Sequence, residues 1–139
     1  MKFHLQMGDG DHIIRGYGPG QITVDRDIYR ASIVVLPQRI IEDCLPRQFH
    51  ELAATHFETL AGLEPELVIL GTGRRLHFPP PRITTCLMDA SIGLEVMDTA
   101  AACRTYNILM GEGRRVVAAL LMIEDRGRTV RVQNSESIE

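Results

Sequence analysis

The chain has 139 residues, of which 45% are hydrophobic and 24% charged, and its formal net charge is −3. This balance is typical of a folded soluble domain, and it excludes both a disordered chain and a broad basic surface for nucleic acid. The longest strongly apolar run, residues 116–123, is far shorter than the roughly 20 residues of a membrane-spanning helix. We expect one domain over 1–139, located in the cytoplasm because residues 1–7 lack the apolar core of a signal peptide.

The first third of the chain predicts β structure. Residues 11–17, 21–24 and 28–36 are rich in β-branched or alternating residues, and turn residues separate them at 16–20 and 25–27. We expect a meander of three strands. The glycines of the first turn fit chain reversal better than a phosphate-binding loop, because no helix follows them directly.

The rest of the chain alternates helical and strand patterns. The expected elements are a helix over 46–61, a strand over 67–70, a helix over 82–91 that ends at Gly93, a buried strand over 94–97, a helix over 99–110 and a central strand over 116–122. Short apolar runs between amphipathic helices predict an α/β domain whose sheet is covered by helices. Near the end of the chain, apolar and polar residues alternate briefly at Val130 and Val132. We expect the polar tail from about 134 to be frayed.

Polar residues follow two of the expected strands and indicate a binding surface. Parallel strands that each feed a helix end at one edge of a sheet, where helix N-terminal N–H groups converge. We therefore expect the end of the strand 67–70 and the stretch 98–107 to meet. The candidate binding residues are Gly71, Thr72, Gly73, Asp98, Thr99, Arg104 and Asn107.

Structural roles for these candidates remain open beside the functional one. Helix capping alone would explain Asp98 or Thr99, since a short side-chain oxygen accepts an orphan N–H group. A tight exit from a buried strand would explain the glycines. Arg104 opposes the helix dipole so near the N-terminus, so it either pairs with Asp98 or Glu95 or binds an anion or a partner.

The sequence contains no complete catalytic or metal-binding set. Cys44, Cys86 and Cys103 are widely spaced and fit reduced thiols in a reducing compartment. His56 lies on the apolar face of its helix and fits a core or rim histidine with one hydrogen-bond partner. We therefore predict no catalytic residue, no metal site and no cofactor.

Several of these stretches together resemble the Mth938-like family, a small α/β family of unknown function. Its mitochondrial branch includes an assembly factor for respiratory complex I. The resemblance covers nearly the whole chain, and its most specific parts are residues 66–73, 78–80, 93–107 and 112–120. It implies a three-layer α/β domain with a mixed central sheet and helices on the sheet faces, to which the strand spacing adds the N-terminal meander.

The resemblance also implies a function. We expect a non-enzymatic association role, with complex I subunits or assembly proteins as partners, in the cytoplasm or beside the inner membrane through such a partner. The alternative is a small-molecule or anion-binding protein, or an enzyme, that uses the crevice between Gly71–Gly73 and the stretch 98–107. The sequence leaves the oligomeric state open.

Overall fold

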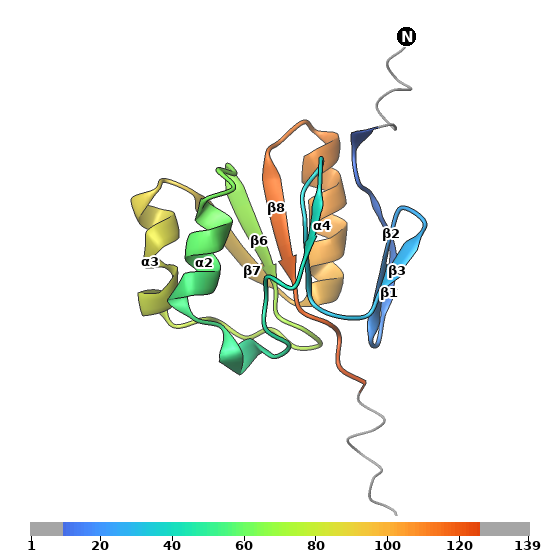
Figure 1. Cartoon of the computed structure of the whole chain (residues 1–139), viewed down its shortest axis with the longest axis horizontal. Coiled ribbons are helices and arrows are strands. Elements are labelled where there is room, and N and C mark those ends of the chain that lie inside the picture. The colour runs from blue at the N-terminus through green and yellow to red at the C-terminus, as the bar shows by residue number, and fades with distance from the viewer. Residues whose placement is uncertain (1–9, 126–139) are drawn as a thin grey trace, which may run out of the picture.

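The computed structural model describes residues 10–125, which form two β-sheets and three α-helices (Figure 1). The elements are β1 (Ile14–Gly18), β2 (Gln21–Val24), β3 (Asp27–Tyr29), β4 (Ile33–Val35), β5 (Ile40–Glu42), the 3₁₀ turn η1 (Phe49–Glu51), α2 (Ala54–Ala61), β6 (Leu67–Gly71), α3 (Pro81–Asp89), β7 (Gly93–Met97), α4 (Thr99–Gly111) and β8 (Val116–Leu120). The expected alternation at Val130 and Val132 and the expected frayed tail lie outside the described residues.

The larger sheet is mixed, as predicted. Its strand order is β5-β4-β8-β6-β7. β6 runs parallel to both β7 and β8, whereas β4 is antiparallel to β8 and β5. β8 is central, and every residue of β6 and β8 is buried, because apolar layers cover both faces of these strands. The prediction that the three apolar runs share one sheet is confirmed.

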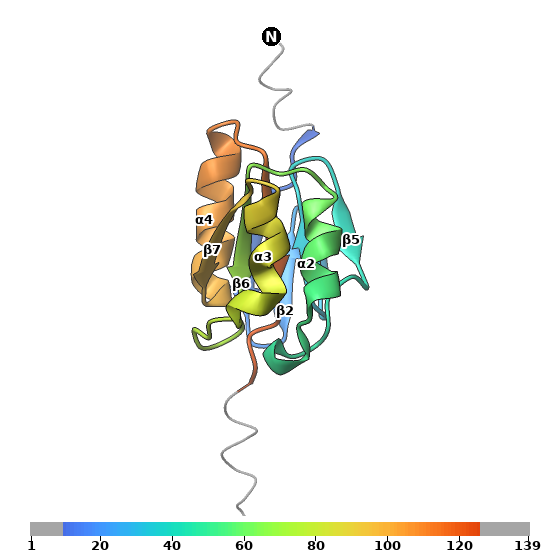
Figure 2. The ribbon, with the colours of Figure 1, turned by 90° about the vertical axis from the view of Figure 1, so that its left-hand side faces the viewer.

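This sheet is the middle of three layers (Figures 1 and 2). α2 and α3 cover one face, while α4 and the three-stranded sheet β1-β2-β3 cover the other. Alternation along β6 divides its side chains between two cores, with Ile69 facing α4 and both Val68 and Leu70 facing α2 and α3. The expected three-layer α/β architecture is therefore confirmed.

The expected strand over 28–36 is wrong in one respect, because it is two strands in different sheets. β3 ends at Tyr29 in the small sheet, and β4 begins at Ile33 in the large one. Ile28 is half exposed, whereas all of β4 is buried. A β-rich run does not reveal which sheet its halves join, since pairing is decided by distant strands. β5, which pairs with β4, was not predicted.

The expected helix over 46–61 is also wrong in its first half. Only η1 and α2 are helical, and between them Leu52 and Ala53 have extended backbones. The His56 ring Nδ1 accepts the Ala53 N–H at 2.9 Å and so starts α2 as a new helix. Leu52 stays in the core with Phe57, so the apolar spacing continues through the break. His56 is half-buried, and within residues 10–125 its ring has the single hydrogen-bond partner that was expected.

The predicted ends of α3 and β7 need two corrections. α3 is followed by Ser91, with a φ of 60°, so Gly93 does not end this helix and instead begins β7. β7 is the last strand of the sheet and is partly exposed, not buried as expected. Among residues 10–125, no strand pairs with the outer side of β7.

Candidate functional site

A loop over residues 72–80, here called the Leu76 loop, leaves β6 beside the first turn of α4 (Figure 1). The Thr99 N–H donates to the Gly73 carbonyl at 2.9 Å, and the Gly73 N–H donates to Thr99 Oγ1 at 2.8 Å. The strand end after β6 and the start of α4 therefore meet, as the sequence predicts.

Gly71 permits this close approach. A Cβ atom at Gly71 would lie 2.9 Å from Thr99 Oγ1, 3.0 Å from Thr99 Cα and 3.1 Å from Ala102 Cβ. Gly73 has a φ of 101°, a backbone region that side-chain-bearing residues rarely occupy. Gly71 therefore allows α4 to pack closely against β6, and Gly73 allows the chain to turn after β6. These are the structural roles that the sequence offered for the two glycines.

Two of the predicted binding residues, Thr72 and Thr99, lie in the interior with their hydroxyls in use. Thr99 Oγ1 donates to the Leu121 carbonyl at 2.7 Å. Thr72 Oγ1 donates to the Arg75 carbonyl at 2.6 Å and accepts the His77 N–H at 3.2 Å. These hydroxyls make hydrogen bonds that stabilise the observed backbone conformation of the Leu76 loop.

Asp98 is the N-cap of α4. Its Oδ1 accepts the Ala101 N–H at 2.9 Å, which satisfies one of the orphan donors of the helix. The capping role considered for Asp98 is confirmed, and Thr99 is the first residue of the helix.

Arg104 contacts β1 from α4. Its Nη1 donates to the Tyr17 hydroxyl at 2.7 Å, and its Cζ lies 6.0 Å from the centre of the Tyr17 ring. The hydrogen bond to Tyr17 raises the pKa of Arg104. Within residues 10–125 it forms no ion pair with Asp98 or Glu95 within 4.0 Å. Its structural partner is therefore a phenol, not a carboxylate.

Asn107 lies over two turns further along α4 and does not join the Gly71–Gly73 exit. Its Oδ1 accepts the Ile14 N–H at 2.9 Å, and its Nδ2 donates to the Ile14 carbonyl at 2.8 Å. The amide therefore pairs with the backbone of β1 as a neighbouring strand residue would.

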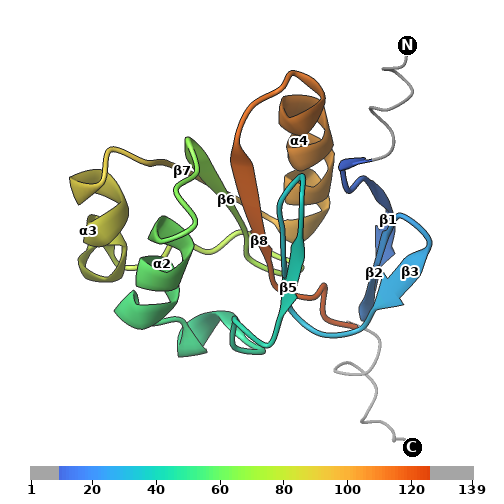
Figure 3. The same cartoon turned by 45° about the horizontal axis from the view of Figure 1, so that its top comes forward.

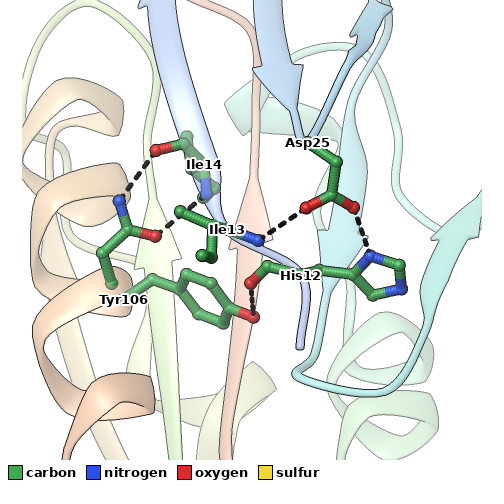
Figure 4. A network of polar contacts seen from close by, with 6 residues as sticks. His12, Ile13, Ile14, Asp25 and Tyr106 are labelled. Carbon is green, nitrogen blue, oxygen red and sulfur yellow. Dashed lines mark hydrogen bonds and ion pairs between the residues drawn. The ribbon is translucent and has the colours of Figure 1, made fainter. Parts of the chain in front are cut away.

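The neighbouring polar contacts tie the start of β1 to α4 and to the turn after β2 (Figure 4). The Tyr106 hydroxyl donates to the His12 carbonyl at 2.9 Å, and Asp25 Oδ2 lies 2.7 Å from His12 Nδ1. Burial would raise the pKa of Asp25, but hydrogen bonds from His12 and the Ile13 N–H outweigh it and lower this pKa. These contacts position the small sheet.

Sequence reasoning missed the exposed apolar residues of the Leu76 loop. Leu76 is 49% exposed and Phe78 is 71% exposed. The signal was present in the sequence, because two large apolar residues stand among arginines and prolines directly after a buried strand. Exposed aromatic groups on a held loop are typical of partner contacts.

Two adjoining grooves lie at the same end of the sheet, beyond β8. The first, of about 490 Å³, is lined by Arg47, Gln48, Phe49, His50, Thr72, His77, Leu121, Met122 and Glu124. The Phe49 and His77 rings are 5.2 Å apart, so the Leu76 loop contacts η1 at this groove. The second groove, of about 840 Å³, shares four of these residues. Asp98, Arg104 and Asn107 line neither groove.

A family model described as "Protein of unknown function (DUF498/DUF598)" matches residues 14–121. The chain belongs to this family. A solution NMR structure of a Bordetella pertussis protein, described as a Mth938-like domain, has a TM-score of 0.72 and 30% identity, and the match covers 86% of this chain and 92% of that one. The resemblance stated from the sequence is confirmed.

Two curated relatives of this family member illustrate what is known of similar proteins. An uncharacterised protein of Rhodobacter capsulatus is 36% identical over 109 residues, which are 78% of this chain and 82% of that one. The bovine NADH dehydrogenase (ubiquinone) 1 alpha subcomplex assembly factor 3 is 34% identical over 110 residues, which are 78% of this chain and 59% of the bovine protein. The chain thus spans less than two thirds of that assembly factor.

Two further features of residues 10–125 concern the thiols and the possible metal ligands. Burial raises the pKa of Cys103 to about 12, so its thiol is a poor nucleophile at neutral pH. Cys44 and Cys86 are also free thiols. In the described part of the chain, no three His, Cys, Asp or Glu residues are grouped to hold a metal ion. No helix over residues 10–125 has the length and apolar character to cross a bilayer.

Proposed function

We propose that this protein is a non-enzymatic association factor that binds a protein partner, in a role like that of the complex I assembly factor to which it is similar. The identity of 34% over 110 residues supports this proposal. On this proposal the partners are complex I subunits or other assembly proteins, and binding takes place in the cytoplasm, where a partner brings the protein to the inner membrane.

The Leu76 loop is the observation that carries the proposal. Phe78 is 71% exposed, although transfer of such a ring out of water is favourable. The loop backbone is already held by the buried hydroxyls of Thr72 and Thr99. Binding through a loop of fixed shape costs little ordering entropy, so the exposed ring can act as an anchor in a partner's pocket.

Charge around the loop indicates the chemistry of the partner surface. Arg74, Arg75 and Arg82 flank Leu76 and Phe78, and no acidic residue lies between 73 and 82. Within residues 10–125 these three guanidinium groups form no ion pair within 4.0 Å. The partner surface on this proposal is an apolar pocket bordered by carboxylates.

A matched pair of variants tests the proposal. Phe78→Ser removes the exposed ring of the loop, and Met88→Ser removes a side chain that is 77% exposed on α3. In a host that possesses complex I, tagged full-length protein is expressed in a deletion strain, and quantitative mass spectrometry measures the complex I subunits that co-purify. Loss of an aromatic anchor costs about 2 kcal/mol, so we expect Phe78→Ser to weaken capture about 30-fold. Met88→Ser should match the wild type.

The deletion strain supplies the second readout. We expect NADH-driven respiration and complex I content to fall on deletion, and to return with the wild type and with Met88→Ser but not with Phe78→Ser. Unchanged complex I content after deletion would contradict the assembly role. Equal rescue by Phe78→Ser and Met88→Ser would contradict the binding role of the Leu76 loop but not the assembly role of the protein.

A further inference from the structure

A second surface, distinct from the exposed side of the Leu76 loop, lies where the two sheets separate. It is the groove of about 840 Å³, here called the fork groove, lined by Gly20, Arg30, Ala31, Ser32, Asp43, Leu45, Arg47, Gln48, Met122, Ile123, Glu124 and Asp125. β4 and β8 pair up to Ile33 and Leu120. Beyond that pair the chain after β8 runs to the small sheet, where the Gly20 N–H donates to the Ile123 carbonyl (Figure 3).

Ser32 is the unusual residue of the fork groove. It is only 6% exposed, and its Oγ has no hydrogen-bond partner within residues 10–125. A buried hydroxyl without a partner is unfavourable, because it has lost its hydrogen bonds to water. Rotation about one side-chain bond redirects this hydroxyl, so a ligand in the groove can receive its hydrogen bond.

Two guanidinium groups line the same groove. Arg30 precedes Ser32 by two residues, and Arg47 comes from the segment between β5 and η1. Neither forms an ion pair within 4.0 Å in the described part of the chain, and the one hydrogen bond of Arg30 is a long contact of 3.4 Å with Gln21 Oε1. Guanidinium and hydroxyl donors together are complementary to a carboxylate or a phosphate.

The groove also contains carboxylates. Glu124 Oε1 accepts the Arg74 N–H at 2.6 Å, and Asp43 and Asp125 complete the acidic lining. These groups disfavour a ligand that carries only negative charge, and they favour one that also carries an ammonium group. The mixed lining therefore selects a ligand with both charges.

We propose that the fork groove binds a small ligand that carries an oxyanion, either carboxylate or phosphate, together with an ammonium group. Arg30, Arg47 and the Ser32 hydroxyl hold the oxyanion, and the acidic wall holds the ammonium group. This site does not depend on the assembly role, because it uses none of the exposed residues of the Leu76 loop.

Titration of the full-length, ¹⁵N-labelled protein tests this site. The probes are O-phosphoethanolamine, 4-aminobutyrate and inorganic phosphate, and amide chemical shifts are followed by NMR. We expect saturable shifts at Ala31, Ser32 and Gln48 with one of the two zwitterions, and weaker binding of inorganic phosphate. Saturation by O-phosphoethanolamine identifies a phosphate ligand, and saturation by 4-aminobutyrate identifies a carboxylate ligand.

Variants separate specific binding from general attraction. Loss of one charge-assisted hydrogen bond should weaken the bound zwitterion about tenfold in Arg47→Gln and in Ser32→Ala. Arg26→Gln, which removes an exposed arginine from the turn between β2 and β3, should leave affinity unchanged. Because the Ser32 hydroxyl has no hydrogen-bond partner within residues 10–125, Ser32→Ala should also keep or raise the melting temperature.

The proposal fails if none of the three probes gives saturable shifts at the groove, or if both groove variants bind like Arg26→Gln. A clear fall in the melting temperature of Ser32→Ala would show that the hydroxyl is already satisfied, and it would remove the residue on which the inference rests. Inorganic phosphate binding as tightly as the zwitterions would overturn the assignment of the acidic wall.

Discussion

The Thr99 hydroxyl lies 2.8 Å from the backbone nitrogen of Gly73 and accepts its N–H group. The same hydroxyl donates to the Leu121 carbonyl at 2.7 Å. One fully buried side chain therefore links the end of β6, the start of α4 and the chain after β8. These three segments meet at the base of the Leu76 loop, so the shape of the loop depends on Thr99.

Replacement of Thr99 by valine should destabilise the fold. The change keeps the side-chain shape but leaves the Gly73 N–H without its partner, which costs about 1–3 kcal/mol in the free energy of unfolding. Urea denaturation measures the change. Thr85→Val, at an exposed position of α3, is the control and should stay within about 0.5 kcal/mol of the wild type. Equal effects of the two variants would contradict the role assigned to the hydroxyl.

Gly71→Ala should also destabilise the protein, for a steric reason. The new methyl group would lie 3.0 Å from Thr99 Cα, a backbone atom that cannot move without shifting α4. Overpacking of this kind costs about 1–3 kcal/mol. Gly16→Ala serves as the control, because within residues 10–125 no heavy atom beyond Gly16 and its two chain neighbours lies within 4 Å of the added methyl group. Thermal and urea melts of both variants measure their stability. If Gly71→Ala left the stability unchanged, α4 would not be packed tightly against β6.

Arg104→Ala should lower the melting temperature slightly and leave partner capture intact. The guanidinium group donates to Tyr17 on β1, so its loss weakens a contact between α4 and the small sheet. After Tyr17→Phe has removed the phenol hydroxyl, Arg104→Ala should have a smaller effect, because the two residues share one interaction. Melting curves of the four proteins measure this coupling. Loss of capture at an unchanged melting temperature would instead indicate a binding role for Arg104.

Asp25 should make stability depend on pH under acidic conditions. Its pKa is lowered in the folded protein from the ordinary 3.8, since hydrogen bonds from His12 and Ile13 overcome the effect of burial. The folded state therefore favours the charged carboxylate, and this stabilisation is present above pH 3.8 and is lost as the pH falls through the lower folded value. Urea melts of the wild type and Asp25→Asn between pH 6 and pH 3 should converge at the acidic end. A constant difference would contradict this assignment.

The sequence by itself determined the elements whose signals are local. β6 and β8 are short runs of apolar residues bounded by turn residues, and both lie within a residue or two of their expected bounds. Asp98 marks the start of α4, because capping acts within one helical turn. The sequence also predicted that residues 71–73, after β6, lie close to Thr99. Parallel strands that each lead into a helix end at the same edge of a sheet.

Only the tertiary structure decided the features that depend on distant partners. Residues 28–36 divide between two sheets because β3 pairs with β2 whereas β4 pairs with β8, and the local pattern is compatible with either sheet. Asn107 is a polar residue of a type usually found on the surface. Its amide nevertheless pairs with the backbone of Ile14, which lies 93 positions away in the chain. The exposure of Phe78 and the lack of a partner for the Ser32 hydroxyl within residues 10–125 also depend on distant segments. Burial and hydrogen bonding at such positions are set by long-range contacts, which no local spacing of residues encodes.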